Sequence, residues 1–216
     1  SMDGMHGDMA GAAAVVGAMA AISQLKVKAN VVGVIAACEN MVSGRAYKPG
    51  DIIGTMSGKS IEVLNTDAEG RITLADAVYY AVAKEKATQV LDIATLTGAA
   101  IVALGNAATA VLATDDELFN KLQQASDVAG EKIWRLPHGE EYKELIKSDV
   151  ADIRNTSTGG AGTITGGLFV GAFVDKTPWL HLDIAGTAWT SKERDYHPKG
   201  ATGVGVRTMF HLANNL

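Results

Sequence analysis

The sequence has little cysteine, little proline and no excess of positive charge. Its 216 residues include four prolines and a single cysteine, Cys38. One thiol excludes an intrachain disulfide and a zinc site built from several thiolates, so we expect a reducing, cytoplasmic setting. The 19 lysines and arginines are outnumbered by 24 aspartates and glutamates, which gives a net charge of −5. Nucleic-acid binding is therefore not expected, because it depends on clustered cations.

Several familiar site motifs are also missing. There is no His-x-x-x-His pair, so a histidine zinc site is not expected, and His181 is interpreted as a hydrogen-bonded core residue. No G-x-S-x-G elbow is present, and the glycines at 159–162 lack the Lys-Ser/Thr ending of a phosphate loop. No basic segment precedes the first apolar run, residues 9–25, which is short for a membrane span. We therefore expect neither a membrane segment nor a nucleotide-binding protein.

What the sequence does contain is an alternation of apolar strand and helix patterns. Continuous apolar runs at 30–37, 89–94, 107–113 and 179–184 indicate buried strands, and residues 60–64 a further strand. Helical patterns cover 9–25, 72–83, 115–129, 140–146 and 204–213, and the Gly-rich stretch at 158–167 leads into an apolar helix that runs through Val174. This order predicts one α/β domain, a three-layer sandwich with a largely parallel or mixed central sheet flanked by helices.

The residues after the expected strands are candidates for a site, because ligands bind beyond the carboxyl ends of strands in such sheets. Residues 65–71 read NTDAEGR, and Asp67 and Glu69 could converge on one divalent cation. The same residues match a capping box, in which Thr66 and Glu69 would cap the following helix. From these residues alone the cap is the favoured alternative, and Asp8 has a similar alternative role at the first helix.

The order of several motifs resembles the leucyl (cytosol) aminopeptidase family of two-metal peptidases. The resemblance begins with NTDAEGR at 65–71 and extends to MHGDMAGAA at 5–13, CENM at 38–41, GRAYKPGD at 44–51, ATLTGA at 94–99 and HLDIAGTAW at 181–189. It implies an α/β catalytic domain that removes N-terminal residues, often leucine, from peptides and assembles into a homohexamer. Capping then becomes a secondary role for Asp67 and Glu69.

The resemblance also implies individual roles. Asp8, Asp67 and Glu69 match metal ligands for two divalent ions, zinc or manganese. Arg71 matches a catalytic arginine that holds a bicarbonate. Five residues match positions that line the substrate site: Met5, Thr95, Leu96, Gly98 and Ala185.

The family's opening segment, which supplies one lysine and one aspartate ligand and is followed by a catalytic lysine, has no counterpart in residues 1–216. We therefore expect an N-terminally truncated catalytic domain with impaired activity and an exposed sheet edge. The alternative hypothesis is a metal-poor interaction or assembly module without catalysis.

Overall fold

A four-stranded mixed sheet forms the centre of the computed structural model, which describes residues 2–193 and 196–216. Its strand order is β3 (Val90–Ala94), β7 (Trp179–Asp183), β4 (Thr109–Ala113) and β5 (Ile133–Arg135). The β3–β7 and β4–β5 pairs are parallel, whereas β4 and β7 are antiparallel. Both β4 and β7 are buried along their whole length, as continuous apolar runs require.

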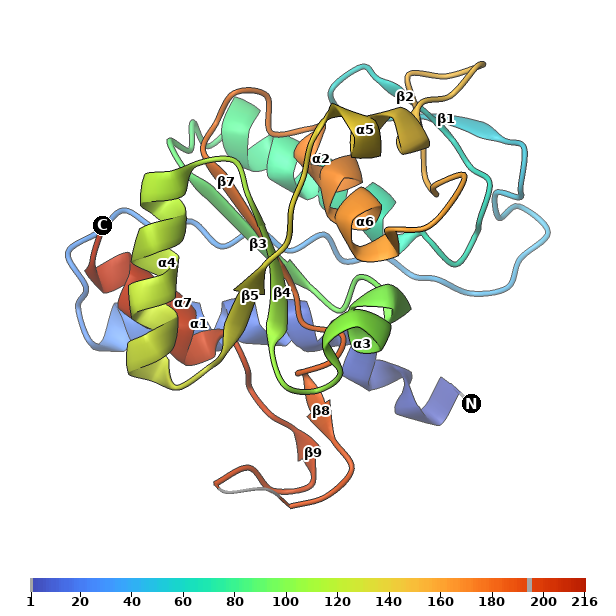
Figure 1. Cartoon of the computed structure of the whole chain (residues 1–216). Coiled ribbons are helices and arrows are strands. Elements are labelled where there is room, and N and C mark those ends of the chain that lie inside the picture. The colour runs from blue at the N-terminus through green and yellow to red at the C-terminus, as the bar shows by residue number, and fades with distance from the viewer. Residues whose placement is uncertain (1, 194–195) are drawn as a thin grey trace.

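Three helices cover one face of this sheet: α1 (Ala10–Gln24), α4 (Asp116–Ala129) and α7 (Val206–Asn214) (Figure 1). Side chains alternate along each strand, so Val111 and Leu182 point toward these helices. The Asp115 carboxylate caps α4 by accepting a hydrogen bond from the backbone N–H of Leu118 at 2.7 Å.

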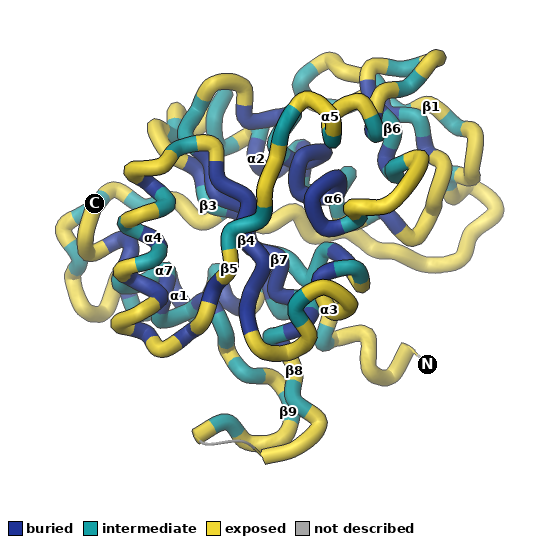
Figure 2. Tube along the Cα trace, in the orientation of Figure 1, coloured by how far each residue is buried: buried dark blue, intermediate teal, exposed yellow. Residues whose placement is uncertain are grey.

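The other face packs against α2 (Gly70–Ala83) and α6 (Gly162–Gly171). Leu112 and Trp179 point to this side, where Phe169 of α6 is completely buried. Figure 2 shows α6, β4 and β7 as the most continuously buried part of the chain. A three-stranded sheet extends this layer, with β1 (Ile52–Gly54) antiparallel and β6 (Ile153–Arg154) parallel to the central β2 (Ser60–Glu62). The remaining elements are short: η1 (Met2–Met9), α3 (Gly98–Leu104), α5 (Glu140–Lys143), η2 (Glu144–Ile146), β8 (Trp189–Thr190) and β9 (Gly200–Ala201).

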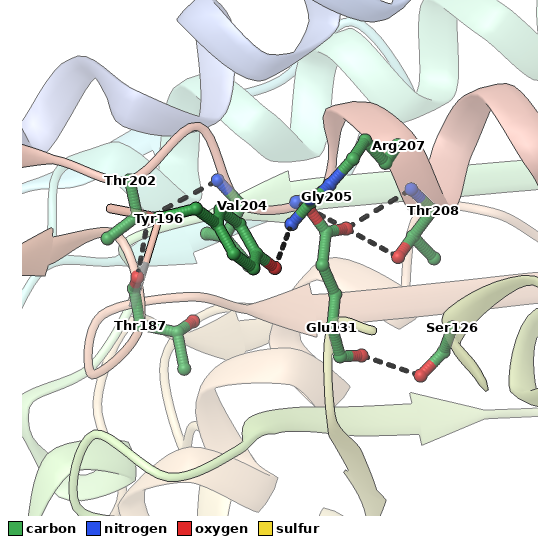
Figure 3. Close-up of polar contacts among 9 residues, drawn as sticks. All are labelled: Ser126, Glu131, Thr187, Tyr196, Thr202, Val204, Gly205, Arg207 and Thr208. Atoms are coloured by element: carbon green, nitrogen blue, oxygen red, sulfur yellow. Dashed lines mark hydrogen bonds and ion pairs between the residues drawn. The ribbon is translucent and has the colours of Figure 1, made fainter. Parts of the chain in front are cut away.

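A buried carboxylate holds α7 against the end of α4 (Figure 3). Glu131 accepts hydrogen bonds from the backbone N–H groups of Gly205 and Thr208, both at 3.1 Å, and from the Thr208 hydroxyl. Arg207 donates to the same carboxylate at 3.3 Å. These bonds satisfy N–H groups at the start of α7 that have no partner within the helix.

Most of the predicted elements are confirmed, including the helices at 9–25, 72–83 and 115–129 and the strands at 89–94, 107–113 and 179–184. The predicted strand at 30–37 is wrong. These residues form no strand, and Val32 and Ile35 are exposed. A strand needs a hydrogen-bonded neighbour, and β3, which lines the same cavity as this segment, pairs with β7 and not with it.

The side of β3 that faces this cavity is an open edge. Val90 N–H donates to Pro178, and the Ala94 carbonyl accepts from Ile184, so alternate peptide groups of β3 face β7. The backbone groups of Leu91 and Ile93 therefore face the other way. In the described part of the chain β3 has a neighbouring strand on one side only.

The stretch Met2–Gln24 is long and apolar enough to cross a membrane by length and composition alone. In this structure its α1 part packs into the core through Ala14, Ala18 and Ile22, next to α7 and β3. Only 22% of the most apolar window in this stretch is buried, so α1 packs on the core through one face.

Candidate functional site

The loops that follow β3 and β7 are held together by Asp183, the buried last residue of β7. One carboxylate oxygen of Asp183 accepts hydrogen bonds from the N–H groups of Leu96 and Ala185, both at 3.1 Å. Its other oxygen accepts from the Thr97 hydroxyl at 2.6 Å. Thr97 in turn caps α3. These bonds therefore fix the course of the backbone at residues 95–97, directly after β3.

Asp8 reaches the same end of β3 from the first turns of the chain. The Thr95 hydroxyl donates to the Asp8 carboxylate at 2.6 Å and to the Asp8 carbonyl at 2.9 Å. Helix α1 begins after Met9 without a side-chain cap, so the alternative that Asp8 caps this helix is not supported. The contact instead places the Asp8 carboxylate beside the residues that follow β3.

The segment at 65–71 connects β2 to α2. The Asn65 side chain accepts a hydrogen bond from the N–H of Asp67 at 2.9 Å, which shapes the turn. Helix α2 begins at Gly70, and the residue before it, Glu69, makes no side-chain capping bond. The capping box proposed for Thr66 and Glu69 is therefore not formed. The carboxylates of Asp67 and Glu69 are therefore not used for helix capping and are available to bind a cation.

Asn155, directly after β6, is the polar residue on which this loop rests. Its side chain is completely buried and bonds to the backbone of Leu64, Asn65 and Ala68. Its carbonyl accepts a hydrogen bond from the Arg71 guanidinium at 3.0 Å. Sequence analysis missed Asn155, because it belongs to no motif and lies about 90 residues from the loop that it contacts.

The Arg71 guanidinium is buried beside α6. A Cβ atom at Gly166 would lie 2.9 Å from Thr97 and 3.4 Å from Arg71, so only glycine leaves this much room. Burial lowers the pKa of Arg71 from its ordinary value, while the charges of Asp183 and Glu69 oppose that shift. Arginine remains a cation under such a perturbation, so the site holds a fixed positive charge.

One cavity of about 1360 Å³ brings the predicted site residues together. Burial raises the pKa of Glu69, and the charges of Asp67 and Asp8 add to this shift, whereas a backbone hydrogen bond and the charge of Arg71 oppose it. Tyr47, in the motif at 44–51, has a raised pKa for the same reasons, burial first and then Glu69. All nine predicted site residues line this cavity: Met5, Asp8, Asp67, Glu69, Arg71, Thr95, Leu96, Gly98 and Ala185.

A smaller cavity of about 230 Å³ adjoins the first. Asp67, Arg71 and Leu96 line both cavities, and Ser157 and Thr165 give the smaller one hydroxyl groups. Arg71 therefore lies between a large, mainly apolar space and a small polar one.

The three carboxylates fit part of a divalent-cation site. They line one cavity, and the charges of Asp67 and Asp8 add to the effect of burial in raising the pKa of Glu69, a repulsion that a cation would relieve. Within residues 2–193 and 196–216, however, no three His, Cys, Asp or Glu side chains are close enough together to form a metal-binding group. Asp8, Asp67 and Glu69 thus surround a common space without converging on one point.

A mixed sheet with helices on both faces, and with acidic groups and a buried arginine at the carboxyl ends of β3 and β7, defines an α/β domain of the enzyme type. The profile of the cytosol aminopeptidase family, catalytic domain, matches residues 1–210. The chain therefore belongs to the cytosol aminopeptidase family, as the resemblance implied.

Individual proteins agree with this family. A probable cytosol aminopeptidase of Clostridium perfringens (strain 13 / Type A) is 58% identical over 210 residues, which are 97% of this chain and 43% of that protein. Another, of Alkaliphilus oremlandii (strain OhILAs), is 56% identical over 215 residues, or 100% of this chain and 43% of its own length. The solved structure of a tomato leucine aminopeptidase mutant matches with a TM-score of 0.86 at 44% identity, covering 95% of this chain and 40% of that one. The chain thus spans less than half the length of the proteins that it matches.

Proposed function

We propose that residues 1–216 form the catalytic domain of a metal-dependent aminopeptidase that releases N-terminal residues, leucine among them, from peptides. The observation that supports this most strongly is that Asp8, Asp67, Glu69 and Arg71 line one cavity, although Asp8 lies about 60 residues before the segment at 65–71 that carries the other three. The cytosol aminopeptidase family supplies peptides as the substrate class.

In this proposal Asp8, Asp67 and Glu69 hold divalent ions, zinc or manganese, of which the complete site takes two. Such ions polarise a scissile carbonyl and lower the pKa of bound water. Carboxylate oxygens suit both ions, although they do not discriminate strongly between them.

Arg71 contributes a fixed cation at the other side of the site. One guanidinium nitrogen is held by the Asn155 carbonyl and the group lies close to Gly166 of α6, so its remaining N–H groups can bind an anion such as bicarbonate or the oxygen of a polarised carbonyl. Met5, Thr95, Leu96, Gly98 and Ala185 line the space for the N-terminal residue of the peptide. The apolar part of this wall favours an aliphatic side chain.

We further propose that residues 1–216 alone turn over substrate slowly or not at all, because three carboxylates that do not converge hold a metal pair weakly. The native assembly is proposed to be a homohexamer in the cytosol, without nucleic-acid or membrane partners.

Binding and turnover test these statements separately. Mn²⁺ titration followed by electron paramagnetic resonance should show binding to the wild-type chain that Asp67→Asn and Glu69→Gln each weaken by about tenfold or more. Leucine hydroxamate, an α-amino chelator, should bind only when Mn²⁺ is present. Absence of Mn²⁺ binding at millimolar metal would contradict the proposed site.

Hydrolysis of leucyl-p-nitroanilide should be slow and sensitive to chelators. Rapid, chelator-sensitive hydrolysis would contradict only the statement on slow turnover. The competing hypothesis, a metal-poor assembly module, expects no metal by elemental analysis and a non-hexameric native mass.

A further inference from the structure

The buried carboxamide of Asn155 uses all of its hydrogen-bonding capacity on one loop. Its oxygen accepts from the N–H groups of Leu64 at 2.8 Å and Asn65 at 3.2 Å. Its nitrogen donates to the carbonyls of Asn65 at 2.6 Å and Ala68 at 3.4 Å. An amide has two acceptor and two donor sites, so none is left over.

These partners fix the orientation of the Asn155 amide. Both groups that face its oxygen are donors, and both groups that face its nitrogen are acceptors, so the reversed amide would lose all four bonds. Aspartate, which has the same shape, keeps the two acceptor contacts but turns a charged oxygen toward two carbonyls.

The backbone of Asn155 is fixed independently of this loop. Its N–H donates to the Glu62 carbonyl at 3.0 Å, which continues the pairing of β6 with β2. Asn155 is therefore a rigid point on the small sheet. The loop at 64–68, by contrast, has two turn bonds of its own, from Ala68 N–H to the Asn65 carbonyl and from Asp67 N–H to the Asn65 side chain.

Asn155 also contacts the cation of the site. Its carbonyl accepts from Arg71 Nη1 at 3.0 Å, while Asn65, which its side chain holds, shapes the turn that carries Asp67. A single residue thus connects the acidic loop to the guanidinium.

We propose that Asn155 is the positioning residue of this site, which sets the placement of the Asp67 and Glu69 carboxylates relative to the Arg71 guanidinium. The inference rests on the proposed function for the identity of the site, but the hydrogen-bond geometry stands without it. Asn155 touches no reacting atom. It acts through the loop at 64–68 and through Arg71.

The test compares Asn155→Asp with a matched control, Glu131→Gln, in the full chain of 216 residues. Glu131 is likewise a buried acceptor of several hydrogen bonds, but it serves α7 rather than the loop. Asn155→Asp should weaken Mn²⁺ binding by about tenfold or more, as loss of an outer-shell partner does. Glu131→Gln should leave the Mn²⁺ affinity within about twofold, because distant sites act independently. A purely structural role predicts equal effects on Mn²⁺ affinity from two variants that lose equal thermal stability.

Amide hydrogen exchange gives a readout that does not depend on metal. In the wild-type chain the N–H groups of Leu64 and Asn65 should be protected, and Asn155→Asp should accelerate their exchange by about tenfold or more. The Nε–H resonance of Arg71 should shift in Asn155→Asp and stay unchanged in Glu131→Gln.

The outcomes separate the two proposals. If the wild-type chain binds no Mn²⁺ but Leu64 and Asn65 are protected by Asn155, the proposed metal site fails and the positioning role stands. If these amides exchange like an open loop in the wild-type chain, or if a folded Asn155→Asp keeps wild-type exchange and Mn²⁺ affinity, the positioning role is overturned. Should Asn155→Asp not fold, Asn155→Ser and the wild-type exchange rates decide the question.

Discussion

The Thr95 hydroxyl donates a 2.6 Å hydrogen bond to the carboxylate of Asp8, a residue 87 positions away in the sequence. The same hydroxyl lies 2.9 Å from the Asp8 carbonyl. Through this contact η1, which has no buried residue of its own, is held at the carboxyl end of β3. The position of one predicted metal ligand therefore depends on one predicted substrate-site residue.

Thr95→Val should release η1. The change keeps the shape of the side chain and removes the hydroxyl, so we expect a loss of about 0.5–1.5 kcal/mol in the free energy of unfolding. Residues 2–9 should also become more sensitive to protease. Urea denaturation and limited proteolysis check this prediction, and an unchanged cleavage pattern would count against it. Thr109→Val, which removes a hydroxyl that contacts Thr187 rather than η1, is the control.

Gly11→Ala should push α1 away from the sheet. A Cβ atom at Gly11 would lie 2.2 Å from the Ile93 carbonyl oxygen, a backbone atom that cannot easily move. We expect a loss of about 1–3 kcal/mol from overpacking. Gly17→Ala, on the same helix, is the control: its Cβ would meet a Val206 methyl group at 3.1 Å, and alanine favours the helix by about 1 kcal/mol. The test is the thermal unfolding of both variants. Equal losses of stability would contradict the close approach of Gly11 to the Ile93 carbonyl.

Asp183→Ala should be one of the most damaging single changes. It leaves two backbone donors and the Thr97 hydroxyl without their buried acceptor, so we expect a loss of about 3 kcal/mol or more. Combined with Thr97→Val, the losses should fall short of additive by about 0.5–3 kcal/mol, since the two residues share one hydrogen bond. Additive losses in this double-mutant cycle would contradict the hydrogen bond between Asp183 and Thr97.

His181 should make stability depend on pH. Burial alone would lower the pKa of His181, but the carboxylates of Asp92, bonded at 2.6 Å, and Asp183 outweigh burial and the charge of Arg71, and the pKa is raised above 6.5. The protonated pair thus adds stability that is complete below about pH 6.5 and is lost as the pH rises through the folded-state pKa. The free energy of unfolding, measured between about pH 5.5 and 8.5, should fall with rising pH in the wild-type chain. In His181→Gln this contribution to the fall should be absent.

The sequence predicted those parts of the fold that local pattern determines. The runs at 89–94 and 179–184 are mainly apolar and of strand length, so each identified its strand. The run at 30–37 has a similar composition but lacks a neighbouring strand in the described structure, and composition does not reveal whether a partner is at hand. The expected buried role of His181 is confirmed by its bond to Asp92.

Some residues of the candidate site could be identified from the sequence, and others only from the structure. Asp67, Glu69 and Arg71 lie within one short motif, and the family resemblance added Asp8 and Thr95. Asn155 and the space-making Gly166 could not be found, because their importance comes from a loop and an arginine that only folding brings near. The metal-binding roles of Asp8, Asp67 and Glu69 remain predictions.

The unpaired side of β3 has a consequence for how the isolated chain behaves at high concentration. β3 has no neighbouring strand on the side of Leu91 in the described part of the chain, although Gly11 of α1 covers the Ile93 carbonyl, and an unpaired edge is a template on which another polypeptide can add as a strand. Solubility should therefore fall steeply as the protein is concentrated or warmed, and the precipitate should be enriched in β-structure.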